Sequence, residues 1–226
     1  MNILITGADG NLGSAVAAKF LEAGHQVYGT MLPGRHADPL EAQAAFTRLE
    51  ADLLHEGPLA EAIARLSVNL HVAVLTVGGF GLGTLESASL EDLDQMLKLN
   101  VHTAFVSVKA LFAHMKAHGE GGRMVLISSK PGLDPRLGSG VLPYALSKAA
   151  IPALAEVVNT DGQAHDIVAS VIAPSIIDTP PNREAMPDAD VSQWVTPADI
   201  AEVIHFATTE PGRVLREPIF KVYGRS

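Results

Sequence analysis

Short apolar segments alternate with longer amphipathic segments along almost the whole chain. The short segments are apolar at nearly every position, as in residues 72–75 and 168–172, and do not alternate between apolar and polar residues. Strands that are buried on both faces have this composition, and strands that alternate with helices form parallel sheets. The pattern therefore predicts an α/β fold, a doubly wound parallel sheet of about seven strands with helices on both faces.

The expected elements leave no division between domains. Strands are predicted at residues 2–6, 26–30, 48–51, 71–77, 123–128, 167–173 and 219–223, and helices at residues 12–23, 58–66, 90–118, 143–159 and 197–208. No repeat or linker interrupts them, so residues 1–226 are predicted to form one domain. One long connection, at about residues 174–196, is rich in Pro, Asp and Asn, and loops of this length often cover a binding site. We expect it to cover the substrate.

The composition argues against several classes of function. The chain has a net charge of −9 and no basic cluster, whereas nucleic-acid binding needs a concentrated cationic face. It contains no cysteine, which excludes disulfide bonds and thiolate chemistry. Its nine histidines are scattered, and His114 with His118 lacks the further ligands of a zinc hydrolase, so no metal site is expected. No signal peptide or membrane-length apolar run is found, and we expect a cytoplasmic protein without a membrane partner.

A glycine-rich segment joins the first expected strand to the first expected helix. Gly7 would allow the sharp turn off the strand, Gly10 would let the backbone approach a pyrophosphate, and Gly13 would let the helix pack closely on the sheet. A plain glycine-rich turn is the alternative, but the position between strand and helix favours a Rossmann-type dinucleotide site, with the phosphates at the helix N-terminus. The predicted cofactor contacts here are Gly7, Asp9, Gly10, Asn11, Leu12 and Gly13.

The residues after the second and third strands bear on which dinucleotide binds. An acidic side chain after the second strand is typical of NAD sites, whereas a cation there accepts the 2′-phosphate of NADP. Residues 28–34 contain no acid, and Arg35 follows within reach of the strand end. NADP is therefore the favoured cofactor and NAD the alternative, because Arg35 could equally be a solvated cation paired with Asp38. Asp52 and its neighbour Leu53 are further candidates for contact with the adenine, although Asp52 could simply precede a helix.

Tyr144 and Lys148 are four residues apart in an expected helix and so lie on one face, one turn apart. Tyrosine has a reference pKa near 10, so proton exchange near neutral pH needs a downward shift of roughly 3 units, and a neighbouring cation favours the phenolate. Lys148, helped by the charge of an oxidised nicotinamide, could supply that shift. An ordinary amphipathic helix with a packed Tyr144 and a solvated Lys148 is the alternative, because this spacing is common.

Two further polar residues give this pair its context. Ser129 ends a strand-like run, and Asn100 lies in the long helix before it. With the glycine turn, Asn100, Ser129, Tyr144 and Lys148 resemble the pattern of the short-chain dehydrogenase/reductase family along nearly the whole chain. The resemblance implies that Tyr144 donates a proton, that Lys148 binds the nicotinamide ribose and tunes the tyrosine, that Ser129 polarises the substrate oxygen, and that Asn100 supports a proton relay.

Other segments resemble one branch of this family, the quinonoid dihydropteridine reductases. Residues 178–194 look like the corresponding loop of those enzymes, and Gly78 and Gly79 lie in a similar glycine-rich turn after the fourth strand. Residues 174–179 resemble the family segment that anchors the nicotinamide carboxamide, which implies cofactor contacts for Pro174, Ile177 and Thr179.

The chain also departs from that branch. Those reductases usually have an aspartate where Met31 stands, and they lack equivalents of Ser129 and Asn100, both of which are present here. The resemblance therefore implies an NAD(P)H-dependent oxidoreductase that transfers hydride between the nicotinamide and a small carbonyl or imine substrate. A quinonoid dihydropteridine reductase is one alternative, and a non-catalytic NADP-sensing regulatory protein is another. The resemblance also implies a homodimer or homotetramer formed through helices 90–118 and 143–159.

A few residues have no assigned role at this stage. Pro152 falls inside an expected helix, where it would leave the Lys148 carbonyl without its usual donor four residues later and could bend the helix. Phe80 and Trp194 could line a substrate pocket or anchor their loops on the core. Asn182 and Arg183 could bind an anionic group of the substrate or be solvated.

Overall fold

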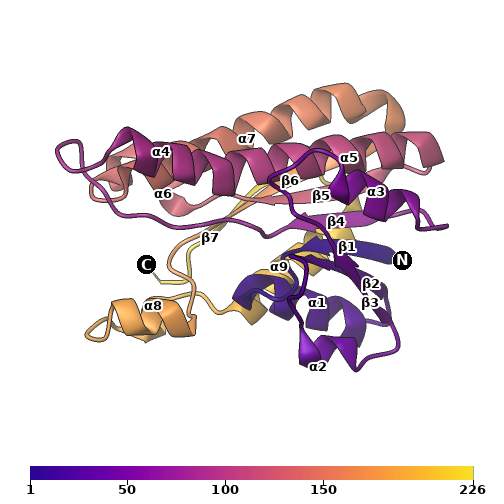
Figure 1. Ribbon diagram of the computed structural model, residues 1–226, viewed down its shortest axis with the longest axis horizontal. Coiled ribbons are helices and arrows are strands. Elements are labelled where there is room, and N and C mark those ends of the chain that lie inside the picture. The colour runs from indigo at the N-terminus through magenta and orange to yellow at the C-terminus, as the bar shows by residue number, and fades with distance from the viewer. Residues whose placement is uncertain (226) are drawn as a thin grey trace.

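The computed structural model describes residues 1–225, and residue 226, the last of the predicted domain, lies outside the described residues. Seven strands, all pairing in parallel, form one sheet in the order β3-β2-β1-β4-β5-β6-β7 (Figure 1). The prediction of a doubly wound parallel sheet is confirmed. The strands are β1 (Asn2–Thr6), β2 (Gln26–Met31), β3 (Phe46–Glu50), β4 (Val72–Leu75), β5 (Gly122–Ile127), β6 (Ile167–Pro174) and β7 (Ile219–Val222).

Helices cover both faces of the sheet, and each face has its own apolar layer (Figure 1). Leu111 and Ile151 are fully buried in one layer, and Phe20 and Ile204 in the other. Each such side chain contributes about 1.5–3 kcal/mol of burial free energy. One face carries α3 (Pro58–Ala64), α4 (Leu90–Leu97), α5 (Thr103–His118) and α7 (Leu142–Gly162), and the other carries α1 (Asn11–Glu22), α2 (Asp38–Glu41) and α9 (Pro197–Thr208).

The strand order reverses between β1 and β4, which are neighbours although β2 and β3 lie between them in the sequence. Thr6 pairs with Leu75 at the carboxyl ends of these two strands, and the Thr76 hydroxyl donates a hydrogen bond of 2.5 Å to the Thr6 carbonyl. Open α/β sheets bind their ligands outside the carboxyl ends of the strands at such a reversal. The fold thus brings the glycine turn after β1 beside the loop after β4, where a cofactor would be expected.

The predicted helix 90–118 is interrupted, which is a correction to the sequence analysis. α4 ends at Leu97, a π-helical turn η1 covers Lys98–His102, and α5 begins at Thr103. Such turns bond each residue to the fifth one along and often occur at functional sites. The sequence did not reveal the break because apolar residues recur through all three segments, and Asn100 is buried within the π turn.

The connection after β6 is more ordered than an open loop. It contains α8 (Pro180–Ala185) and a 3₁₀ turn at Val191–Gln193. Val195 bridges Ile177, with its N–H donating to the Ile176 carbonyl at 3.0 Å and its carbonyl accepting from the Asp178 N–H at 2.8 Å. Both ends of the connection are therefore fixed to each other, and α8 projects away from the sheet (Figure 1). That this segment covers the substrate stays a prediction.

Candidate active site

The glycine turn after β1 has the backbone geometry that a closely approached phosphate requires. Gly7 has a φ of 64°, in the left-handed region that favours glycine. A Cβ at Gly13 would lie 2.1 Å from the Gly7 carbonyl oxygen, so only glycine allows α1 to start this close to the turn. Gly10 is the N-cap of α1, and no side chain caps the helix start. The first N–H groups of α1, which include those of Asn11 and Leu12, are thus left for an anionic group to accept.

Arg35, which the sequence placed within reach of the end of the second strand, lies beside the glycine turn, and its partner is different from the one considered. Its Nε donates to the Asp9 carboxylate at 3.0 Å, and Asp38 is not its partner. Arg48 on β3, which the sequence analysis did not single out, pairs with Glu50. The Glu50 carboxylate also accepts from the N–H of Gly34 at 3.4 Å, so Arg48 lies near the segment that carries Arg35. The guanidinium of Arg35 remains largely exposed, so it can turn toward a bound phosphate.

The two candidates after β3 differ in what they can contact. Asp52 is partly exposed and accepts a hydrogen bond of 3.0 Å from the Leu54 N–H. Leu53 is buried and belongs to the apolar layer under α3 and α5. The carboxylate of Asp52 is accessible to a ligand, whereas the Leu53 side chain is largely taken up by the core.

Lys148 lies on α7 with its ammonium group directed at the end of β5. Its Nζ donates to the Ile127 carbonyl at 2.9 Å, and the residue is only 6% exposed. Burial lowers the pKa of Lys148 to about 8, so the side chain is still mostly protonated at neutral pH. A Cβ at Gly78 would lie 2.6 Å from Asn100 Oδ1 and 3.2 Å from this Nζ, so a side chain in the loop after β4 would displace both buried groups.

Asn100 connects the loop after β4 to α7. Its Oδ1 accepts from the Gly79 N–H at 2.9 Å, and its Nδ2 donates to the Gly79 carbonyl at 3.0 Å and to the Ser147 hydroxyl at 2.9 Å. Ser147 in turn donates to the Tyr144 carbonyl at 2.8 Å. The side chain of Asn100 is thus fully engaged in holding Gly79 against the helix that carries Tyr144.

Tyr144 and Ser129 lie near each other at the carboxyl edge of the sheet, close enough for the Ser129 side chain to affect the pKa of the tyrosine. Burial raises the pKa of Tyr144 above its ordinary value, and the hydrogen bond with the Ser129 side chain opposes that rise. Lys148 does not contribute to this shift, so the protein groups alone do not produce the lowering of the Tyr144 pKa that was expected from the lysine. Ser129 Oγ also accepts from the Gly132 N–H at 3.1 Å, which fixes the hydroxyl at the start of α6 (Lys130–Leu133).

Two aromatic residues that the sequence left open have different environments. The Phe80 ring meets the Tyr144 ring edge to face with centroids 5.0 Å apart, and Phe80 is 62% exposed. Trp194 is buried, so it anchors its loop on the core. Phe80 is therefore available to a molecule that approaches Tyr144, whereas Trp194 is not.

The segment after β6 lies at the same edge of the sheet. Pro174 ends β6, Ile177 bridges Val195, and Thr179 is a buried N-cap of α8. Arg183 forms two hydrogen bonds with the Asp178 carboxylate, of 2.5 and 2.8 Å. Its cation is therefore already paired within the loop.

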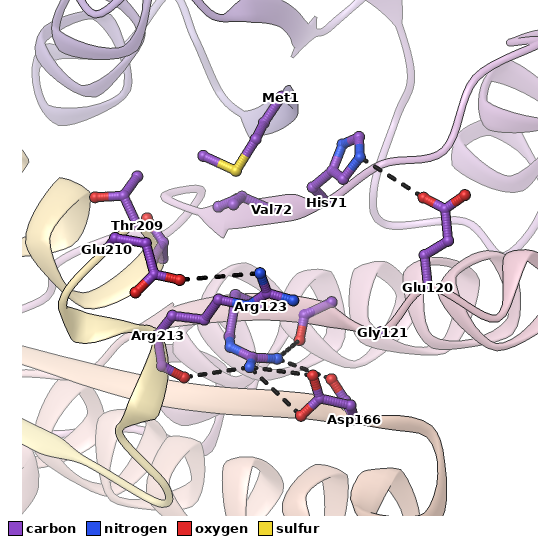
Figure 2. A pocket seen from close by; sticks show the side chains of 12 residues that line it. Met1, His71, Val72, Glu120, Gly121, Arg123, Asp166, Thr209, Glu210 and Arg213 are labelled. Atoms are coloured by element: carbon purple, nitrogen blue, oxygen red, sulfur yellow. Dashed lines mark hydrogen bonds and ion pairs between the residues drawn. The ribbon is translucent and has the colours of Figure 1, made fainter.

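A cavity of about 260 Å³ lies at the opposite edge of the sheet, where β1, β4 and β5 begin (Figure 2). Arg123 is its most buried charged group, and it contacts the Asp166 carboxylate at 3.3 Å. Figure 2 shows Arg213 facing Glu210, at 3.9 Å, in the same cavity. The cations that line it face carboxylates of the same chain, and the catalytic candidates are at the other end of the strands. Within residues 1–225 no group of three or more metal-binding side chains occurs, and no helix is long and apolar enough to cross a membrane.

A parallel sheet with this glycine turn and strand reversal is typical of enzymes that bind a dinucleotide. Comparison with known proteins then identifies the particular group. The chain belongs to the short chain dehydrogenase family, whose model matches residues 1–190. The predicted family and the predicted class, an NAD(P)-dependent dehydrogenase/reductase, are confirmed.

Known relatives span the whole chain at modest identity. Acetoacetyl-CoA reductase from Acinetobacter sp. (strain RA3849) is 25% identical over 240 residues, which cover 98% of this chain and 95% of the relative. Dihydropteridine reductase from Dictyostelium discoideum is 26% identical over 231 residues, which cover 100% and 95%. Among solved structures, ElxO with NADP bound has a TM-score of 0.87 at 22% identity and covers 99% of this chain and 97% of its own, a likeness of fold.

Proposed function

We propose that this protein is an NADPH-dependent reductase of small carbonyl or imine compounds, with Tyr144 as the proton donor. One observation carries the proposal: Lys148, on the same helix as Tyr144, is held at the end of β5 by the Ile127 carbonyl, and the nearby Ser129 side chain lies close enough to Tyr144 to lower its pKa. These groups lie at the carboxyl edge of the sheet, the edge that also carries the glycine turn.

The protonation states suit reduction. A raised pKa keeps the Tyr144 phenol protonated at neutral pH, which is the form that can donate a proton to an oxygen or nitrogen that gains negative charge. Ser129 Oγ accepts from the Gly132 N–H and keeps its own hydrogen as a donor, which can turn from Tyr144 toward the same substrate atom. Lys148 stays mostly protonated at pH 7 and can donate to ribose hydroxyl groups.

The residues that would hold the cofactor fit it. A glycine turn in which a Cβ at Gly10 or Gly13 would meet the Gly7 carbonyl oxygen, followed by an uncapped 12-residue helix, provides a site for a pyrophosphate. When bound, the reduced nicotinamide supplies the hydride. In the proposed site the pyrophosphate is lined by Gly7, Gly10, Asn11, Leu12 and Gly13. The adenosine is faced by Asp9, Arg35 and Asp52, with Leu53 next to them. The nicotinamide end is surrounded by Gly78, Gly79, Lys148, Pro174, Ile177 and Thr179.

NADP is the preferred cofactor in this proposal. The side chain of Arg35 lies at the glycine turn and is largely exposed, so it can exchange Asp9 for a phosphate, whereas the nearby Arg48 is paired with Glu50. Neither Thr30 nor Met31 at the end of β2 provides the carboxylate that favours NAD.

A quinonoid dihydropteridine reductase is the second candidate, and the exposed Phe80 ring against Tyr144 favours it, since a planar pterin can stack on an aromatic ring. The deciding experiment measures NADPH and NADH oxidation with ketones, aldehydes, imines and a quinonoid pterin, in the wild type and in Ser129→Ala. Carbonyl reduction predicts a large loss of turnover in Ser129→Ala. Pterin turnover that is unchanged in Ser129→Ala supports the second candidate, and NADPH binding without any turnover supports a regulatory protein.

We further propose that the protein is a homodimer or homotetramer in the cytoplasm. Phe105 on α5 and Val157 on α7 are large apolar side chains that are half exposed on the long helices. Exposed apolar side chains mark an interaction surface where they join into one contiguous patch, and the proposal places such a patch on these two helices. Sedimentation analysis of the wild type and of Phe105→Glu tests this assembly.

A further inference from the structure

The helix that carries Tyr144 and Lys148 has an irregularity one turn after the lysine. Pro152 lies inside α7, and its ring nitrogen carries no hydrogen. In a regular helix the N–H at this position would donate to the Lys148 carbonyl, four residues earlier. Lys148 is buried, and a buried carbonyl without a donor is unfavourable. Some other group must therefore replace the missing donor.

The Ser128 hydroxyl replaces it. Ser128 Oγ donates to the Lys148 carbonyl oxygen at 2.8 Å, and Ser128 is only 1% exposed. The backbone N–H of Ser128 donates to the Ile172 carbonyl on β6 at 2.8 Å, which fixes the residue to the sheet. The bond that α7 lost to proline is thus made by the central sheet instead of by the helix itself.

The same short segment also holds the other end of the lysine. The Ile127 carbonyl accepts the bond from Lys148 Nζ, and the next residue, Ser128, bonds the backbone of Lys148. Gly132 packs directly against Ser128 and Lys148, because a Cβ there would lie 2.8 Å from Ser128 Oγ and 2.8 Å from Lys148 Cβ. Ser129, the proposed substrate-binding hydroxyl, is covalently next to Ser128.

We propose that Ser128 is a positioning residue for Lys148 and that Pro152 is what makes the chain depend on it. Because the Ser128 hydroxyl replaces the helical N–H as donor to the Lys148 carbonyl, the position of α7 relative to the sheet is fixed at the end of β5. Lys148 and Ser129 are then held in one fixed relation across the cofactor site. This inference rests on the proposed function, in which Lys148 binds the nicotinamide ribose.

The test is a double-mutant cycle with Ser128→Ala, Pro152→Ala and the double variant. Ser128→Ala leaves the Lys148 carbonyl unpaired, so we expect the melting temperature without nucleotide to fall by roughly 3–10 °C. As the lysine shifts, we expect the Kd for NADPH to rise about tenfold. Pro152→Ala restores the N–H, and a carbonyl accepts two bonds, so this variant alone should differ little from the wild type. In the double variant the restored N–H takes over, and most of both losses should be recovered.

Ser107→Ala is the matched control. Ser107 is also 1% exposed and its hydroxyl donates to the Thr103 carbonyl at 2.7 Å, but on α5 that carbonyl keeps its helical N–H donor. This variant should lower the melting temperature less than Ser128→Ala and leave the Kd for NADPH unchanged.

A double variant that melts and binds NADPH no better than Ser128→Ala would overturn the proposal. A Ser128→Ala protein that binds NADPH with wild-type affinity would also overturn it, because the hydrogen bond from Ser128 to the Lys148 carbonyl would then have only a structural role. Lys148→Met separates this outcome from a failure of the proposed function. If Lys148→Met binds NADPH like the wild type, the lysine has no cofactor role, whereas the melting temperatures of the cycle still decide whether the hydroxyl replaces the missing donor.

Discussion

Replacing Lys148 by methionine should expose the free-energy cost of keeping an ammonium group buried beside the sheet. The pKa of Lys148 is lowered from 10.5 to about 8 by burial, which corresponds to about 3 kcal/mol at about 1.4 kcal/mol for each pH unit. Below pH 8 the lysine is protonated in both the folded and the unfolded chain, so the folded state bears the whole cost. Between pH 8 and 10.5 the folded protein binds fewer protons than the unfolded chain, and stability rises with pH. Above pH 10.5 the cost is gone.

The comparison with Lys148→Met isolates this effect, because the other titrating groups are the same in both proteins. Urea unfolding without nucleotide at pH 7.5, 9 and 10.5 gives the free energies of unfolding. Between pH 7.5 and 10.5 we expect the free energy of unfolding of the wild type to rise by about 3 kcal/mol relative to that of Lys148→Met. The loss of the Nζ bond to Ile127 in the variant is the same at every pH and does not affect this change. A difference between the two proteins that does not vary with pH would refute the reasoning, since it would mean that the ammonium is not desolvated.

Three further changes test the parts of the site. Gly13→Ala forces a Cβ to within 2.1 Å of the Gly7 carbonyl oxygen, so NADPH affinity measured by nucleotide fluorescence should fall more than tenfold; an unchanged affinity would contradict the turn's role. Arg35→Ala should weaken NADPH roughly tenfold and leave NADH unaffected, with the exposed Arg65→Ala as control, and equal losses for both cofactors would argue against 2′-phosphate binding. Asn100→Ala removes three hydrogen bonds from a buried site, and urea unfolding should show a loss of about 2–4 kcal/mol; a loss below about 1 kcal/mol would mean that it does not hold Gly79 in place.

The fold, and the positions of the candidate reactive residues within it, could be predicted because their signals are local. Buried parallel strands consist of continuous apolar runs, and such runs placed the central strands within a few residues. The edge strands β3 and β7 contain charged residues and are only partly buried, and their alternation with helices placed them. The spacing of Tyr144 and Lys148 places them on one helix face whatever surrounds the helix. The glycine turn was recognisable because it lies between a strand and a helix.

The remainder depended on contacts between distant segments. The sequence showed that Pro152 would leave the Lys148 carbonyl without a donor, but the replacement comes from Ser128, on a different element. The π turn around Asn100 was hidden because an added residue in a helix leaves no local signal. The direction of the Tyr144 pKa shift was also not predictable, because the burial that raises the pKa exists only in the folded chain.

The most direct test of the account is the rate of NADPH oxidation by wild type and Tyr144→Phe with the best carbonyl substrate from the panel. The substitution removes only the phenolic hydroxyl, and general acid catalysis typically contributes about 10²–10⁴-fold to the rate. We predict a fall of at least about 100-fold in kcat with little change in the Kd for NADPH. A Tyr144→Phe enzyme that reduces the substrate at the wild-type rate would contradict the central claim that Tyr144 donates the proton.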